Sequence, residues 1–217
     1  MSELYKRIIT SITLLIIIII SFSNLNLLIC LLLVTNFIVL DEFIKIYKRI
    51  FNKNFFLQYL TLILTLIYMS YFSLVIFLFM FQSFEINKIK ILFLLLICIS
   101  TDIGGFVFGK TIGGKKITKI SPNKTYSGVA GSFLFSIIFG YVFYNEVNEI
   151  ILLDVNIFYF IILLSLLSQI GDLFISVLKR KAKIKDTGTF LPGHGGILDR
   201  IDGILLSLPI GLIFITA

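Results

Sequence analysis

The sequence has few residues from which a zinc site or a disulfide could be built. It holds one histidine, His194, and two cysteines, Cys30 and Cys98, both inside apolar segments. Zinc sites combine several Cys and His ligands, and the spacing of these three residues matches no such pattern. We therefore expect both cysteines to be buried structural thiols and exclude a zinc site at His194.

Charge is also scarce. Charged residues make up 14% of the 217 residues, hydrophobic residues 58%, and the mean hydropathy is +1.05. Leu57–Phe81 contains no formal charge, and about 20 apolar residues suffice to span a bilayer. No small-residue cleavage site follows the first apolar run, Ile8–Phe22, so we expect a retained span rather than a signal peptide. These features predict an integral membrane protein.

Seven apolar segments alternate with polar connectors. Their length, and the need to satisfy backbone polar groups within lipid, favour helices over strands. We predict an all-α, polytopic helical bundle with about seven transmembrane helices, divided into an N-terminal hydrophobic hairpin (1–56) and a membrane-embedded catalytic domain (57–217). The segments are Ile8–Phe22, Leu25–Leu40, Leu57–Phe81, Ile91–Phe108, Gly128–Tyr144, Ile157–Leu178 and Ile197–Thr216.

The positive charges follow a topological pattern. With the N-terminus inside, seventeen Lys and Arg residues fall on the inner side and only Lys88 and Lys90 on the outer side. This asymmetry agrees with the positive-inside rule and predicts a cytoplasmic N-terminus. The net charge of +7 lies in short loops between apolar runs, so we expect anionic headgroups and nucleotides as partners rather than nucleic acid.

Four aspartates stand out in this apolar setting. Asp102 and Asp172 lie inside apolar helices, where a carboxylate is costly and usually functional. Asp199 and Asp202 share one face of the last predicted helix. All four are predicted at a similar depth, where their charges would repel unless a cation lay among them. A hard divalent ion, Mg²⁺, suits such an oxygen-only site.

Basic and glycine-rich stretches accompany these acids. Lys124 and Thr125 can offer an ammonium and a hydroxyl to a phosphate, although topology alone also makes such a loop basic. Lys179–Lys185 is either a phosphate clamp or a solvated basic run. For His194, a general base, a headgroup contact and a turn-stabilising hydrogen bond are all open.

The segment Ser176–Asp202, SVLKRKAKIKDTGTFLPGHGGILDRID, resembles the signature of the phosphatidate cytidylyltransferases (CDP-diacylglycerol synthases). Two earlier blocks, TDIGGFVFGKTIGGKK and SPNKT, are also similar, so the resemblance covers Thr101–Ala217. Two positions depart from the family pattern: Ser127 replaces a common acid, and Gly203 a common serine. The matching signature positions are Ser176, Lys179, Arg180, Lys185, Asp186, Gly188, Leu191, Pro192, Gly193, His194, Gly195, Gly196, Ile197, Asp199, Arg200 and Asp202.

The resemblance implies the Mg²⁺-dependent conversion of CTP and phosphatidic acid to CDP-diacylglycerol and pyrophosphate. It is compatible with a homodimer. Because the loops rich in polar motifs fall on the basic, inner side, we expect an enzyme of the inner (cytoplasmic) membrane with its active site facing the cytoplasm. Asp172, Asp199 and Asp202, with Asp102, would hold the metal. Lys179, Arg180, Lys185 and Arg200 would clamp phosphates beside Asp186. The expected substrate-binding residues are Lys124, Thr125, Ser176, His194, Gly195 and Gly196.

Three other functions fit parts of the sequence. A CTP-dependent polyprenol or dolichol kinase would use similar phosphate grips but attack the γ-phosphorus. A cation-coupled transporter would use intramembrane acids such as Asp102 and Asp172 along a path, but the sequence shows no paired broken helices. A non-catalytic scaffold would not need buried carboxylates beside a glycine-rich turn.

Overall fold

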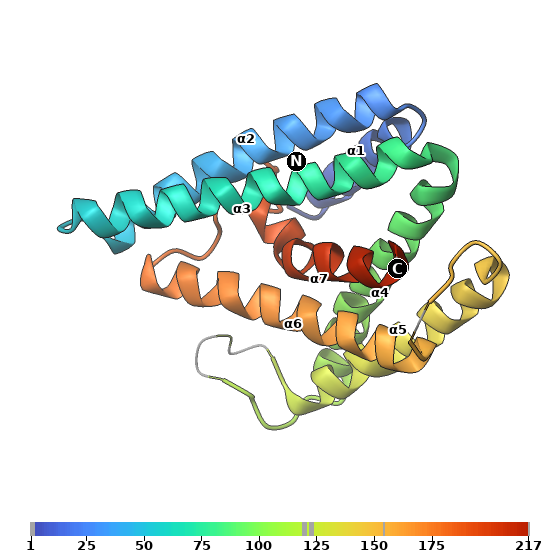
Figure 1. The fold of residues 1–217 in the computed structure, drawn as a ribbon. Coiled ribbons are helices and arrows are strands. Elements are labelled where there is room, and N and C mark those ends of the chain that lie inside the picture. The colour runs from blue at the N-terminus through green and yellow to red at the C-terminus, as the bar shows by residue number, and fades with distance from the viewer. Residues whose placement is uncertain (1–2, 119–120, 122–123, 154, 217) are drawn as a thin grey trace. The chain divides into compact units, whose positions relative to one another are not determined.

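The computed structural model describes residues 3–118, 121, 124–153 and 155–216, and within them the chain is helical, with two isolated bridges and no strand. The all-α prediction is therefore confirmed for this part of the chain, and each predicted apolar segment lies largely within one helix (Figure 1). The helices are α1 (Glu3–Ser21), α2 (Leu25–Ile50), α3 (Phe55–Gln82), α4 (Phe84–Thr111), α5 (Tyr126–Val147), α6 (Ile157–Lys181) and α7 (Leu198–Thr216).

Side-chain caps fix the starts of α2, α3 and α5. Asn24 accepts a hydrogen bond from the amide of Asn26 at the start of α2, and Asn54 does the same for Leu57 in α3. The hydroxyl of Thr125 accepts from the amide of Gly128 in α5. Asn and Thr favour these positions because their side chains satisfy amides that lack a helical partner.

The second helix is longer than its apolar segment. α2 runs ten residues beyond Leu40, through Asp41 and Glu42 to Ile50. Asp41 pairs with Lys45 one turn later, at 2.5 Å, and such pairs support a helix after its apolar face has ended. Hydropathy therefore located the membrane part of α2 but missed its polar extension.

Within the described residues, five helices, α2 to α6, are long and apolar enough to cross a membrane. α1 contributes a shorter apolar helix, Arg7–Ser21, and α7 carries Asp199, Arg200 and Asp202 in its first two turns. The protein is thus a multi-pass membrane protein. The count of seven spans and the cytoplasmic N-terminus remain predictions.

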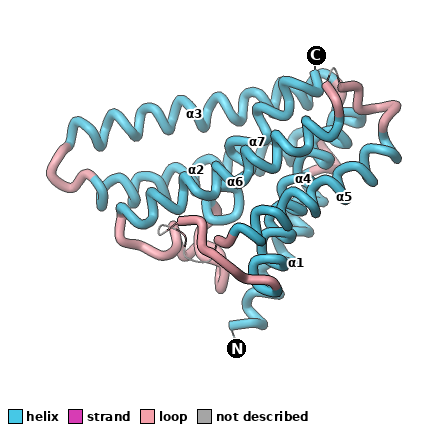
Figure 2. Tube along the Cα trace, turned by 90° about the horizontal axis from the view of Figure 1, so that it is seen from below, coloured by secondary structure: helices cyan, strands magenta, loops and turns pink. Residues whose placement is uncertain are grey.

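The chain forms two compact units. The first joins Met1–Phe84 to Leu178–Ile201, and the second joins Glu85–Val177 to Asp202–Ala217. The predicted division at residue 56 concerns function and remains a prediction. Figure 2 shows helices along most of the trace, with loops between them; the connections at 112–125 and 182–197 carry the polar motifs.

Within the first unit, α2 packs against both α1 and α3. Polar side chains join α2 to α3 at two levels. The Tyr47 hydroxyl lies 2.9 Å from that of Thr65, and the Asn36 amide donates to the Ser73 hydroxyl at 2.6 Å. Interhelical hydrogen bonds of this kind hold helices together where lipid removes the hydrophobic drive to associate.

Within the second unit, glycines bring α4 and α5 into close contact. A Cβ atom on Gly104 would lie 2.3 Å from the carbonyl oxygen of Gly131, and one on Gly105 would lie 2.7 Å from the hydroxyl of Ser132. Small residues at such a crossing let two helix backbones approach. These glycines therefore serve the packing of α4 against α5.

We expect Gly104→Ala to destabilise the protein by about 1–3 kcal/mol, the usual cost of overpacking a tight interface. Gly109→Ala is the matched control in the same helix. Its nearest contact would be an ordinary 3.4 Å, to the Thr125 hydroxyl, and alanine gains up to about 1 kcal/mol of helix propensity. Thermal unfolding in detergent measures both, and equal melting temperatures for the two variants would contradict the packing role.

The two cysteines differ in their surroundings. Cys98 is buried, as predicted, and its sulfur lies 3.0 Å from the Ser207 hydroxyl. Cys30 is exposed on α2, so its predicted burial is wrong. An apolar segment of a membrane protein can face lipid as well as the protein interior, and hydropathy does not separate the two.

Candidate active site

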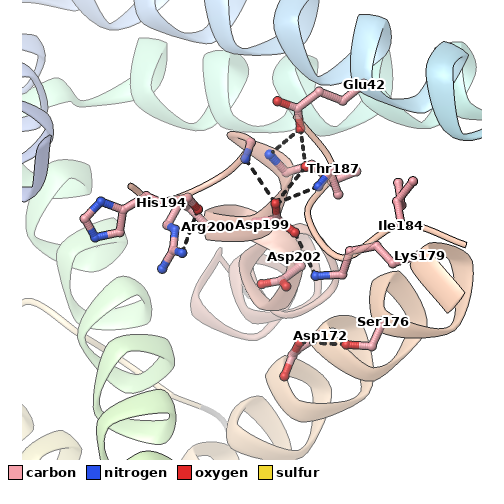
Figure 3. Close-up of polar contacts among 12 residues, drawn as sticks. Glu42, Asp172, Ser176, Lys179, Ile184, Thr187, His194, Asp199, Arg200 and Asp202 are labelled. Atoms are coloured by element: carbon pink, nitrogen blue, oxygen red, sulfur yellow. Dashed lines mark hydrogen bonds and ion pairs between the residues drawn. The ribbon is translucent and has the colours of Figure 1, made fainter. Parts of the chain in front are cut away.

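The site in the first unit is organised around Asp199, in the first turn of α7. Its Oδ1 accepts from Nζ of Lys179 at 2.7 Å. Its Oδ2 accepts from the amide of Thr187 at 2.8 Å and from the amide of Gly196 at 3.0 Å (Figure 3). The side chains of Asp199 and Lys179 are only 6% and 13% exposed, so this is a largely buried ion pair.

These contacts tie together three parts of the signature. Asp199 links the end of α6, through Lys179, to the loop at Thr187 and to the glycine-rich turn at Gly196. Charge-assisted hydrogen bonds are stronger than neutral ones. Asp199 therefore holds the signature loop in shape, and both of its oxygens are engaged in doing so.

A second carboxylate, Glu42 of α2, meets the same segment. Its Oε1 accepts from the amide of Ile197 at 2.9 Å, and its Oε2 accepts from the amide of Leu198 at 3.0 Å. The Thr187 hydroxyl donates to Oε2 at 2.7 Å, and Glu42 is 2% exposed. The sequence interpretation missed Glu42 because it ended the apolar segment at Leu40. The signal was an acid just after the apolar run and followed by two more apolar residues, Phe43 and Ile44.

The signature loop lines a cavity of about 650 Å³ in the first unit. Arg200 donates to the carbonyl of His194 at 2.8 Å, and Arg7 of α1 donates to the carbonyl of Gly193 at 3.0 Å. Ligand pockets commonly measure roughly 300–1,000 Å³, so the cavity has the size of a small-molecule site. Its lining residues are Arg7, Lys185, Asp186, Gly188, Thr189, Leu191, Pro192, Gly193, His194, Gly195 and Arg200.

His194 lies between α1 and the cavity. Its Nε2 is 3.4 Å from the Ser11 hydroxyl, and the adjacent Pro192 carbonyl accepts from Thr10 at 2.7 Å. Burial and the charges of Arg200 and Arg7 lower the pKa of His194 below its usual value, so the neutral imidazole prevails at pH 7. The contact with Ser11 ties the turn at His194 to α1, and the three alternatives for His194 stay predictions.

A second cavity, of about 260 Å³, lies within the second unit. Lys124 forms an ion pair with Asp172 at 2.5 Å, and Ser176 donates to Asp172 at 3.4 Å. Asp102, Lys124, Thr125 and Asp172 all line this cavity. The structure thus brings together two of the predicted metal ligands and the predicted phosphate grip. Pro122 and Asn123 of the same block lie outside the described residues.

The predicted four-aspartate cluster is divided between the units. Asp199 belongs to the first unit, whereas Asp102, Asp172 and Asp202 belong to the second. Among the described residues, no three Asp, Glu, His or Cys side chains are grouped so that they could hold a metal ion. The convergence of all four aspartates remains a prediction.

Comparison with known proteins identifies the family of this chain. The model of the cytidylyltransferase family matches residues 5–217. The chain belongs to the cytidylyltransferase family. The resemblance read from the signature is therefore confirmed, and the match extends it to the N-terminal helices.

Several proteins named phosphatidate cytidylyltransferase are similar to this chain. That of Rickettsia bellii is 44% identical over 145 residues, which cover 64% of this chain and 61% of the relative. That of Helicobacter pylori is 38% identical over 135 residues, covering 60% and 50%. That of Bacillus subtilis is 40% identical over 111 residues, covering 51% and 41%. The chain thus spans about half the length of the curated relatives it matches.

Four of the residues predicted for the site have structural roles of their own. A Cβ atom on Gly196 would lie 2.1 Å from the Thr187 hydroxyl and 2.4 Å from Oε2 of Glu42. Gly195 has φ +86°, a conformation that favours glycine. Thr125 caps α5. Arg180, predicted to clamp phosphates, donates to the carbonyl of Ile184 at 3.4 Å.

The two departures from the family pattern are accommodated locally. The Ser127 hydroxyl donates to the carbonyl of Gly113 and lies 2.9 Å from the hydroxyl of Thr125. A carboxylate cannot donate such a bond. A Cβ atom at Gly203 would lie 2.4 Å from the Ser168 hydroxyl, so α6 and α7 are close here and leave little room for a serine.

Proposed function

We propose that the chain transfers CMP from CTP to phosphatidic acid, forming CDP-diacylglycerol and pyrophosphate. An oxygen of the lipid phosphate attacks the α-phosphorus of CTP, and the bond from that phosphorus to the pyrophosphate breaks. The observation that carries the proposal is the small-molecule-sized cavity, built from signature residues and lined by Arg7, Lys185 and Arg200. The names of the similar proteins support the same reaction.

The main barrier to this reaction is that two anions must meet. Cationic side chains placed around the reacting phosphates lower that barrier by neutralising charge as it builds up in the transition state. In the first unit, Lys185 and Arg200 would grip the triphosphate, and Arg7 would add a third positive charge. The lipid phosphate is already anionic near pH 7, so the neutral His194 need not act as a base.

Mg²⁺ is proposed as the cofactor. Asp102 and Asp172 line one cavity, and Mg²⁺ is commonly held by one or two carboxylates together with substrate phosphates and water. Their oxygen chemistry therefore fits the ion, and binding of it by Asp199 and Asp202 stays a prediction from the sequence. When bound, Mg²⁺ would stabilise the charge of the leaving pyrophosphate. Lys124, which pairs with Asp172, would hold a phosphate next to it.

We further propose seven membrane spans, a cytoplasmic N-terminus and an active site facing the cytoplasm at the inner membrane. The asymmetry of Lys and Arg between the connectors supports this topology. The substrates support it as well, because CTP is delivered from the cytoplasm and a lipid phosphate lies at the membrane surface. The homodimer compatible with the family resemblance stays a prediction.

Product analysis tests the function. Detergent-purified protein receives CTP labelled in the α-phosphate, phosphatidic acid and Mg²⁺, and we expect label in CDP-diacylglycerol. The same mixture with a polyprenol acceptor and γ-labelled CTP tests the kinase alternative. Label in a polyprenol phosphate, with none in CDP-diacylglycerol, would replace our proposal with the kinase.

Asp172→Asn tests the metal assignment. We expect the Mg²⁺ concentration for half-maximal activity to rise about tenfold or more, in the range seen when the support of a metal site is removed. Lys124→Met is the matched control, since it breaks the same ion pair but keeps the carboxylate. Equal Mg²⁺ dependence in both variants would show that Asp172 only pairs with Lys124, and the metal assignment would fail.

A further inference from the structure

Glu42 stands outside the family signature and outside both cavities, yet it contacts the centre of the signature loop. It is a buried carboxylate on α2 that accepts three hydrogen bonds, from Ile197, Leu198 and Thr187. A buried charge is costly unless it is well paired and hydrogen-bonded. Here the donors include amides at the N-terminus of α7, where the helix dipole also favours a negative charge.

Thr187 connects Glu42 to Asp199. Its hydroxyl lies 2.7 Å from Oε2 of Glu42 and 3.0 Å from Oδ2 of Asp199, while its amide donates to Asp199. A hydroxyl has a single proton, so it donates to one carboxylate at a time, and the distances favour Glu42. The two acids therefore hold the same residue from opposite sides (Figure 3).

The loop backbone lies directly on the Glu42 carboxylate. A Cβ atom on Gly188 would be 2.8 Å from Oε1, and one on Gly196 would be 2.5 Å from the same oxygen. Side chains at these positions would separate the loop from α2. Glu42 thus contacts both ends of the segment Thr187–Leu198, which includes the cavity-lining residues from Gly188 to Gly195.

We propose that Glu42 is a positioning residue of the active site. By holding the segment Thr187–Leu198, it sets the shape of the cavity and the orientation of Asp199, and so the geometry in which CTP meets the bases that line the cavity. The inference rests on the proposed cytidylyl transfer and deepens it. It also gives the N-terminal helices a part in catalysis that their hydrophobic character alone does not suggest.

Glu42→Gln is the direct test, because it keeps the side-chain size but removes the charge and one acceptor. We expect kcat/KM for CTP, per folded protein, to fall on the order of 100-fold. A loss of this size is typical when catalytic groups are displaced by about 1 Å. Val39→Ala is the matched control: Val39 is fully buried on the same helix, and the change leaves the carboxylate in place. Its kcat/KM should stay within about twofold of the parent protein.

Hydrogen exchange supplies a readout that does not depend on activity. In Glu42→Gln, we expect the amides of Ile197 and Leu198 to exchange at least about tenfold faster, since their acceptors are weakened, whereas Val39→Ala should leave them unchanged. Unchanged exchange in Glu42→Gln would overturn the proposal. Faster exchange with unchanged kcat/KM would overturn it too, since Glu42 would then be structural only. If the parent protein transfers no CMP, the proposed function fails, and the exchange result still decides whether Glu42 holds the loop.

Thr187 gives a second, milder test. Thr187→Val removes the hydroxyl at nearly constant volume, and Thr187→Ser keeps it. We expect Thr187→Val to lose kcat/KM on the order of tenfold, the loss of one buried hydrogen bond, and Thr187→Ser to retain it. Equal kinetics in the two variants would show that the link from Thr187 to Glu42 does not matter for catalysis.

Discussion

Asp199→Asn is expected to abolish CMP transfer and to cost about 3–5 kcal/mol of stability, the usual effect of breaking a buried ion pair. The change leaves Lys179 buried without its counter-charge. It also weakens the acceptance of bonds from Thr187 and Gly196, which shape the loop. Residual CMP transfer and the melting temperature of the detergent-purified variant measure the two effects.

Asp41→Asn is the matched control for Asp199→Asn. Asp41 also forms an ion pair, with Lys45, but the side chains are 50% and 62% exposed. Exposed pairs contribute about 0–1 kcal/mol, so we expect little change in stability and none in activity. If Asp199→Asn behaved like Asp41→Asn, the buried ion pair of Asp199 and Lys179 would not be needed for stability or activity.

Gly196→Ala is expected to remove activity almost entirely and to lower the yield of folded protein. The added methyl group would lie 2.1 Å from the Thr187 hydroxyl and 2.4 Å from the Glu42 carboxylate, and both are buried. Either the loop moves away from α2 or the two side chains leave their positions. Overpacking of this kind costs about 1–3 kcal/mol or more.

Two measurements on Gly196→Ala separate loss of shape from loss of folding. Size-exclusion chromatography in detergent gives the folded fraction, and the CMP-transfer rate is then expressed per folded protein. We expect that specific rate to fall at least about 100-fold, because the loop is displaced. A folded variant with the parent's specific rate would contradict the close packing of Gly196 on Glu42.

The sequence predicted the helices and the family well, for a physical reason. Hydropathy and helix propensity are local, so apolar segments such as Leu57–Phe81 appear as helices wherever they lie. The signature residues lie within one short stretch, Ser176–Asp202, and their chemistry is readable there. The family match confirms that interpretation.

Local sequence patterns were less informative where the surroundings of a residue determine whether it is exposed or where its helix ends. Hydropathy could not tell that Cys30 would be exposed and Cys98 buried. It placed the end of the second segment at Leu40, although α2 continues to Ile50. A residue can face lipid, the protein interior or water at the polar end of a helix. An averaged hydropathy scale does not distinguish these three environments.

The sequence by itself determined that this is a helical membrane protein with the signature of the cytidylyltransferase family, because both properties depend on residues that are neighbours in the sequence. Only the tertiary structure decided which groups support that signature. Glu42 and Thr187 are 145 positions apart, and Arg7 and Gly193 are 186 apart. Such pairs form only when packing brings together residues that are distant in the sequence. No local pattern in one sequence shows which distant residues will meet.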